Sequence, residues 1–175
     1  MPLPLADPRT VEAQFVAGVT LEESGDLDGA ARVYAELLET ADDARAALNL
    51  GTILYNRREY SAAEELYRRA TIADPGRALA WFDLGNALDE LARIDEAIDA
   101  YEVAVRLCPT YADARYNLAL AHERAGEPRR AIRHWAKYAK ADPASPWGNH
   151  ARLMVRRILD RDKLEIVWRR DGGAL

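Results

Sequence analysis

Three prolines recur along the chain at a constant step of 34 residues, at Pro75, Pro109 and Pro143. Each ends a similar short phrase, which reads Ala-Asp-Pro, Leu-Cys-Pro and Ala-Asp-Pro. A constant step of this length indicates a repeat protein, in which each unit is one supersecondary motif that stacks on its neighbours. The remaining residues are therefore interpreted by their place within a repeat.

Other residue types keep the same step. Small residues recur in two series, Gly51, Gly85 and Ala119, and Ala63, Ala97 and Ala131. Aromatic residues recur as Tyr67, Tyr101 and Trp135, and a weaker earlier unit contains Gly18, Gly25, Ala30 and Tyr34. Small side chains at fixed places let two helices approach closely, so each unit is predicted to be a tightly packed helix pair.

The third unit shows two helical stripes of apolar residues. The first stripe is Trp81, Leu84, Leu88 and Leu91, and the second is Ile94, Ala97, Ile98, Tyr101 and Val105. Both have the helical period, with about 13 residues to each helix. Gly25 and Gly126 fit the turn between the helices, where a left-handed residue is needed.

This pattern resembles the tetratricopeptide repeat. The third unit matches best, with Trp81-x-x-Leu84-Gly85-x-x-Leu88, then Ala97-x-x-x-Tyr101, then Pro109. The resemblance implies an all-α fold, a right-handed superhelical α-solenoid of four helix-turn-helix repeats with a C-terminal capping helix. It also implies a protein that binds other polypeptides.

The expected organisation follows from the repeat register. An N-terminal extension covers residues 1–10, and a degenerate first repeat covers 11–43. The other repeats cover 44–77, 78–111 and 112–145, followed by a capping helix at 146–160 and an extended tail at 161–175. In the capping helix, Trp147, Ala151, Met154, Val155 and Ile158 are expected to face the last repeat. The tail alternates apolar and other residues, and it binds its own chain, binds another chain or stays disordered.

The composition favours a soluble, cytoplasmic, bacterial-type protein. The chain has 175 residues and a single cysteine, Cys108, which excludes an internal disulfide framework. No signal peptide or membrane-length apolar segment is visible in the sequence.

No catalytic or cofactor motif stands out, so we expect no enzyme, no cofactor and no metal site. The sequence contains neither a Gly-rich phosphate loop nor a nucleophile elbow. His122 lies where the family places a core aromatic residue and is expected to be packed. His134 and His150 show no metal-ligand spacing.

In repeats that resemble these, the first helix of each pair lines a concave groove. The resemblance therefore implies a peptide-binding groove made by the following residues: Phe15, Arg45, Leu48, Asn49, Thr52, Asn56, Phe82, Asp83, Asn86, Asp89, Asp113, Tyr116, Asn117 and Glu123. Within it, Phe15, Leu48, Phe82 and Tyr116 form an apolar row. Asn49, Asn86 and Asn117 suit the clamping of a peptide backbone, because an amide both donates and accepts.

The groove is expected to be acidic and to bind a basic or neutral peptide or helix. Chaperone-binding members of the family hold a C-terminal carboxylate with lysine and arginine, but the matching places here are Leu48, Thr52 and Asp83. Residues 1–123 carry a net charge of −12 and residues 124–175 a net charge of +7. The basic C-terminal tail of a second copy is therefore an alternative ligand.

Two further alternatives remain at this point. Residues 63–70, 83–91 and 163–168 resemble the repeat halves of bacterial regulators with a MerR-like DNA-binding half, which this chain lacks; the alternative is thus a partner-sensing regulatory module. Direct nucleic-acid binding by the basic C-terminal third is disfavoured, because acids interrupt it and the net charge is negative.

Overall fold

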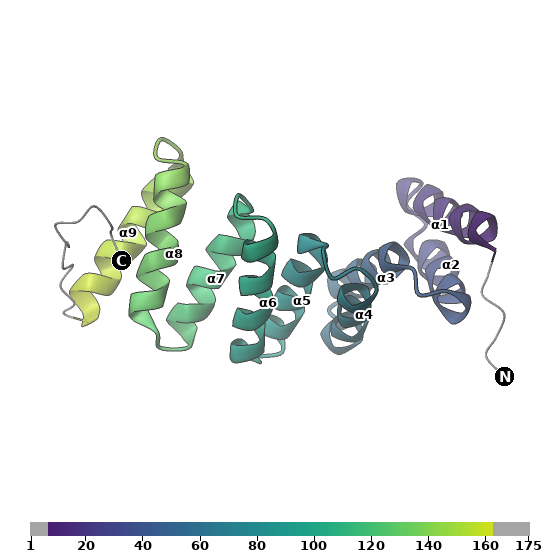
Figure 1. Cartoon of the computed structure of the whole chain (residues 1–175), viewed down its shortest axis with the longest axis horizontal. Helices are drawn as coiled ribbons and strands as arrows, with labels where there is room; N and C mark the ends of the chain where they lie inside the picture. Colours follow the sequence, from purple (N-terminus) through teal and green to yellow (C-terminus); the bar gives the residue numbers. More distant parts are fainter. Residues whose placement is uncertain (1–6, 163–175) are drawn as a thin grey trace. The chain divides into compact units, whose positions relative to one another are not determined.

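The computed structural model describes residues 7–162, and every regular element in that range is an α-helix (Figure 1). The chain divides into two compact units, residues 1–93 and residues 94–175. Unit 1 contains α1 (Pro8–Glu23), α2 (Leu27–Thr40), α3 (Ala44–Asn56), α4 (Tyr60–Ala73) and α5 (Ala78–Glu90). Unit 2 contains α6 (Ile94–Leu107), α7 (Ala112–Arg124), α8 (Pro128–Ala141) and α9 (Pro146–Asp162).

The helix starts reproduce the sequence step. The helices α3, α5, α7 and α9 begin 34 residues apart, at Ala44, Ala78, Ala112 and Pro146. The helices α4, α6 and α8 do the same, at Tyr60, Ile94 and Pro128. In unit 1, α1 packs on α2 and α3 packs on α4, while in unit 2 α8 packs on both α7 and α9. The expected all-α architecture of helix-turn-helix pairs is confirmed.

Glycines in the first helices let aromatic residues of the second helices come close. A methyl group on Gly18 would lie 2.4 Å from the ring of Tyr34, and one on Gly51 would lie 2.7 Å from the ring of Tyr67. Both rings are buried, so they have little room to move away. The small residues predicted from the step therefore set the spacing of these helix pairs.

The turns between paired helices all contain one residue with a left-handed backbone. Gly25 and Gly126 have φ values of +85° and +72°, as their sequence places predicted. The equivalent positions in the other two turns hold Arg58 and Ala92, with φ values of 65° and 59°. A side chain costs free energy in this conformation, so two of the four turns are strained.

The helices begin at residues that satisfy their free amide groups. Asp26 accepts a hydrogen bond from the amide of Gly29 at 2.8 Å, and Asp43 accepts from two amides of α3. At α9, Ser145 accepts from the amide of Gly148 at 2.9 Å. A methyl group on Gly148 would lie 1.8 Å from the carbonyl oxygen of Asp142, so only glycine fits this tight entry into α9.

The two ends of the chain differ from the expected boundaries. Helix α1 already begins at Pro8, capped by Asp7, so residues 8–10 do not belong to an extension. Helix α9 continues to Asp162, so residues 161 and 162 do not belong to an extended tail. The predicted tail from residue 163 onward lies outside the described residues. None of the described helices is long and apolar enough to cross a membrane.

The outer helix α9 is only partly buried by its neighbours. Ala151, Met154 and Ile158 lie in the core with Trp135 and Ala131, as their spacing predicted. Trp147, which was expected to face the same way, is 59% exposed. That expectation was wrong, because α9 has the start of α7 and not a complete repeat beside its first turn.

Candidate functional site

The first helices of the pairs form the surface on which the predicted groove residues lie. We call it the first-helix face; it consists of α1, α3 and α5 in unit 1 and of α7 and α9 in unit 2. One row of equivalent positions on it is Glu12, Arg45, Leu79, Asp113 and Trp147. A second row is Phe15, Leu48, Phe82, Tyr116 and His150.

The sequence analysis ended both rows at α7 and missed their members on α9. The step of 34 residues from Asp113 and Tyr116 leads directly to Trp147 and His150. The structure confirms that these residues are neighbours, since the rings of Tyr116 and His150 stack with centroids 6.1 Å apart. Helix α9 therefore continues the first-helix face, in addition to closing the core.

The apolar row is interrupted at Leu48, which is only 6% exposed. The prediction of a continuous exposed strip through Phe15, Leu48, Phe82 and Tyr116 was wrong at this position. Phe15, Phe82 and Tyr116 are half-buried. Leu48 thus supports the core of unit 1 and offers almost no surface to a ligand.

Arg45 is held in place by a ring and two carboxylates. Its guanidinium carbon lies 4.0 Å from the centre of the Phe15 ring. It also forms ion pairs with Glu12 at 2.9 Å and Asp43 at 2.8 Å. Hydrogen bonds to Asp43 and Glu12 raise the pKa of Arg45 above its ordinary value. In unit 1, Glu12 is therefore a neutralised acid.

Asn49 belongs to a hydrogen-bonded network inside unit 1. Its amide nitrogen donates to Glu22 at 3.0 Å and to the hydroxyl of Tyr34 at 3.0 Å, and Tyr34 in turn donates to Glu22. Both amide hydrogens are thus used within the protein. The expectation that this amide clamps a peptide backbone through its hydrogens was wrong.

The position of Asn49 recurs as Asp83 and Asn117, and Asn86 lies one helical turn away from this series. Asp83 is therefore a carboxyl group where the neighbouring repeats carry an amide. Burial raises the pKa of Asp83 from 3.8 to about 7, and a hydrogen bond from Asn86 opposes the rise in part. No described lysine or arginine contributes to this pKa, so Asp83 is a half-buried acid without a cation beside it.

Further acids lie near Asp83 in unit 1. Burial raises the pKa of Tyr55 to about 12, and the charges of Glu90, Asp89 and Asp83 add to the rise. Beside them, Thr52 and Asn56 are exposed, and Tyr67 donates a 3.4 Å hydrogen bond to the hydroxyl of Thr52. This part of the first-helix face is acidic and carries several polar groups that a ligand could reach.

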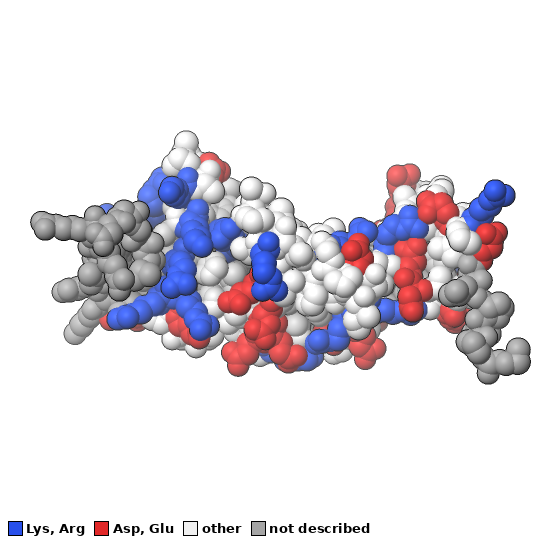
Figure 2. All heavy atoms as spheres, viewed as in Figure 1, with Lys and Arg blue, Asp and Glu red and all other residues white. Residues whose placement is uncertain are grey.

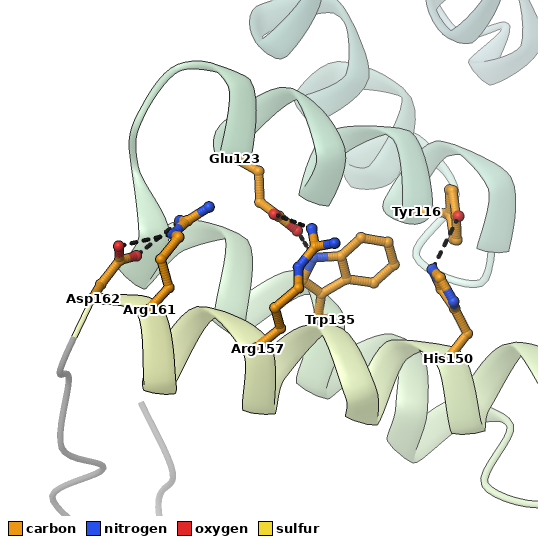
Figure 3. A network of polar contacts seen from close by, with 7 residues as sticks. All are labelled: Tyr116, Glu123, Trp135, His150, Arg157, Arg161 and Asp162. Atoms are coloured by element: carbon orange, nitrogen blue, oxygen red, sulfur yellow. Dashed lines mark hydrogen bonds and ion pairs between the residues drawn. The ribbon is translucent and has the colours of Figure 1, made fainter.

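In unit 2, two predicted groove residues are used to hold α9 (Figure 3). Glu123 accepts a 2.8 Å hydrogen bond from the indole of Trp135 and a 3.1 Å bond from Arg157, and its side chain is 9% exposed. The hydroxyl of Tyr116 contacts the imidazole of His150 at 3.5 Å. Glu123 is therefore a structural acid, and its prediction as a ligand-facing groove residue was wrong.

Two histidines of unit 2 lie in the interior. His122 is fully buried, as expected, and its Nδ1 contacts a carboxylate oxygen of Glu127 at 2.7 Å. The ring of His134 stacks on it with centroids 5.3 Å apart. Burial, with a smaller contribution from His122, lowers the pKa of His134 from 6.5 to about 4. Within residues 7–162 no group of three potential metal ligands occurs.

Charge is distributed unevenly over the surface. Figure 2 shows lysine and arginine side chains gathered over α8. This helix carries no acid, and its exposed cations are Arg129, Arg130, Arg133, Lys137 and Lys140. The cations lie on the second helix of a pair, whereas Asp83 and Asp89 lie on a first helix.

The helix pairs, their constant step and the packing of small against aromatic residues define a helical repeat protein of the solenoid class. The tetratricopeptide repeat model matches residues 5–46, 15–78, 48–112 and 82–146. The chain belongs to the tetratricopeptide repeat family, whose repeats serve as protein–protein interaction scaffolds.

Two curated relatives show how far the similarity extends. The peroxisomal targeting signal receptor of Kluyveromyces lactis is 38% identical over 78 residues, which are 45% of this chain and 14% of the receptor. The inactive repeat-containing thioredoxin TTL3 of Arabidopsis thaliana is 32% identical over 111 residues, 63% of this chain and 16% of that protein. The matched segment thus spans less than a fifth of either relative.

Solved structures share the fold over most of the chain. The crystal structure of MamA has a TM-score of 0.76 and 28% identity, and the match covers 84% of this chain and 85% of that one. YrrB, described as having an unusual peptide-binding site, has a TM-score of 0.72 at 21% identity, with coverage of 84% and 76%. The similarity to YrrB shows the fold alone.

Proposed function

We propose that this chain is a non-enzymatic scaffold that binds a peptide or helix of a partner protein on the first-helix face of unit 1. The observation that carries the proposal is Asp83, a half-buried carboxyl with a raised pKa and no cation beside it. Burying an acid costs free energy unless a cation or hydrogen-bond donors compensate. A partner that brings a cation or a donor to Asp83 would recover that cost.

Neighbouring residues support a peptide as the ligand. Phe82 is half-buried beside Asp83 on α5, while Thr52 and Asn56 are exposed on α3. Together they offer an aromatic ring, polar groups and a negative charge on one surface, as peptide-binding faces usually do. The acidic character favours a basic or neutral segment. Relatives named as targeting signal receptors agree with a receptor-like role.

The acidity is more local than expected. Glu12 is paired with Arg45, and Glu123 is used by Trp135 and Arg157. Ligand binding is therefore proposed for the surface around Asp83, Asp89 and Phe82, in place of an evenly acidic groove. The regulatory-module alternative gains no support from the relatives described above, and we do not propose it.

Site-specific photocrosslinking tests the proposal. A photoreactive phenylalanine analogue replaces Phe82 in one variant and Ile72, which is 75% exposed on the second helix α4, in the control. We expect discrete crosslinked partners at Phe82 that disappear when Asp83 is also changed to Ala. The same set of partners at both positions, or crosslinking at Phe82 that ignores Asp83→Ala, would refute the proposal.

A further inference from the structure

In unit 1 the chain shows how it binds a guanidinium on the first-helix face. Arg45 of α3 lies over the ring of Phe15 and pairs with Glu12, both on the preceding first helix α1. The arrangement thus uses one aromatic ring and one carboxylate, three residues apart, on one helix. Such a pairing combines a cation–π contact with an ion pair.

Unit 2 repeats the ring and the carboxylate but not the arginine. On α7, Tyr116 is equivalent to Phe15, and Asp113 is equivalent to Glu12. On the next first helix, α9, the position equivalent to Arg45 is Trp147. The indole of Trp147 lies edge-on to the ring of Tyr116, with centroids 6.1 Å apart and an interplanar angle of 88°.

Other aromatic rings hold Tyr116 in a fixed orientation. The buried ring of Trp135 lies at 4.8 Å, and the rings of Tyr138 and His150 lie at 5.9 and 6.1 Å. Trp147 is the open member of this cluster, with 59% of its surface exposed. A large exposed indole on a rigid aromatic support has little conformational freedom to lose on binding, which is typical of a recognition site.

A second carboxylate lies on the same side of unit 2. Burial raises the pKa of Tyr138, and the negative charges of Asp113 and Asp142 add to that rise. Both acids are therefore close to the Tyr138 hydroxyl, and both are exposed. The described residues form no ion pair with either acid. The nearby arginines are directed to backbone carbonyls, Arg115 to Pro109 and Arg152 to Pro143.

We propose that Trp147, Tyr116 and Tyr138, with Asp113 and Asp142, bind an arginine side chain of a partner. The guanidinium takes the place that the Arg45 guanidinium has in unit 1, over the Tyr116 ring and beside Asp113, with the indole face of Trp147 on its other side. Arginine suits this surface better than lysine, because its planar group stacks on rings and pairs with two carboxylates.

This site deepens the proposed scaffold function by naming a side chain of the ligand, and it can be tested without any partner protein. The probe is N-acetyl-arginine amide, with the neutral isostere N-acetyl-citrulline amide as the matched ligand. Binding is followed by NMR through the indole N–H signal of Trp147 and the backbone amide of His150. The full-length chain is used throughout.

We expect saturable shifts of both signals with the arginine probe and at least about tenfold weaker binding of the citrulline probe. Trp147→Ala should abolish the shift at His150. Leu153→Ala, which removes an equally exposed side chain (58%) from the same helix, should leave it unchanged. Asp113→Asn with Asp142→Asn should weaken binding about tenfold.

Equal affinity for the two probes would overturn the inference, since the site would then recognise apolar surface instead of charge. So would arginine binding that survives Trp147→Ala or the double asparagine variant. The change Asp83→Asn lies in unit 1 and should not alter arginine binding here. Loss of the partner crosslinks at Phe82 and loss of arginine binding at Trp147 are thus separate outcomes.

Discussion

Trp135 donates its indole hydrogen to Glu123 at 2.8 Å, and the two residues lie 12 positions apart in a helix pair of unit 2. Tyr34 and Glu22, also 12 positions apart, make the equivalent bond in unit 1. In each case a donor from the next first helix completes the carboxylate, Arg157 in unit 2 and Asn49 in unit 1. A buried acid thus links three successive helices at both places (Figure 3).

Removing Glu123 should destabilise unit 2 more than removing its ion-pair partner. The variant Glu123→Ala leaves the indole N–H of the buried Trp135 without an acceptor, at a cost of about 2 kcal/mol. Arg157 is 58% exposed, so Arg157→Ala should cost less than about 1 kcal/mol. Urea unfolding followed by circular dichroism measures both changes. Equal losses would contradict a structural role centred on Trp135.

The left-handed turn residues Ala92 and Arg58 offer a stabilising change. Glycine at either position should raise the free energy of unfolding by about 0.5–1 kcal/mol, because φ values of 59° and 65° cost nothing for glycine. The matched control is Ala125→Gly, at a position with an ordinary φ of −73°, which should lose a similar amount. Thermal unfolding compares the three variants, and the same sign at Ala92 and Ala125 would rule the explanation out.

The close approach of Gly51 to Tyr67 predicts the opposite response to an added methyl group. Gly51→Ala gains about 1 kcal/mol of helix propensity but forces its methyl to 2.7 Å from the buried ring. We expect a net loss of about 1–2 kcal/mol. Gly76→Ala is the control, since its nearest contact would be an ordinary 3.7 Å from Asp74. Urea midpoints provide the comparison, and a stabilised Gly51→Ala would show that the helices can separate freely.

These results show how much of the fold and site follows from the sequence. Positions within a repeat were predictable, because a constant step fixes which residues are equivalent. Exposure was not, because it depends on the size of side chains on the next helix: Leu48 is buried where Phe82 is half-exposed. The role of Glu123 could not be inferred either, because its partner Arg157 lies in a helix interpreted only as a cap. Trp147 followed the apolar spacing of α9, but the helix has no further repeat to cover it.

The buried histidine pair predicts a loss of stability in acid. His134 has a pKa of about 4 in the folded chain and 6.5 when unfolded, so the unfolded state binds more protons between these values. Stability should therefore fall as the pH drops from 6.5 to 4, by on the order of 2–3 kcal/mol. The change His134→Leu, matching Leu66 in the second repeat, should remove most of this dependence. Urea unfolding at a series of pH values is the measurement; an unchanged slope would contradict the assignment.

Asp83 should act on stability with the opposite sign. Its pKa is about 7 in the folded chain and 3.8 when unfolded, so between these values the folded state binds more protons. Stability due to the neutral carboxyl is present below pH 4 and is lost as the pH rises to 7, where the buried charge costs on the order of 3 kcal/mol. Asp83→Asn, which copies the amide of Asn49 and Asn117, should therefore stabilise the chain above pH 7.

The same substitution separates stability from binding, because a site kept for a ligand gives up stability that a simpler side chain would provide. Asp83→Asn should bind the proposed basic partner more weakly while unfolding at higher urea above pH 7. In the wild type, partner affinity should fall as the pH drops below 7 and Asp83 gains its proton. Urea unfolding and partner titrations at matched pH test both halves. A variant that is more stable and binds equally well would show that the Asp83 carboxyl serves no ligand.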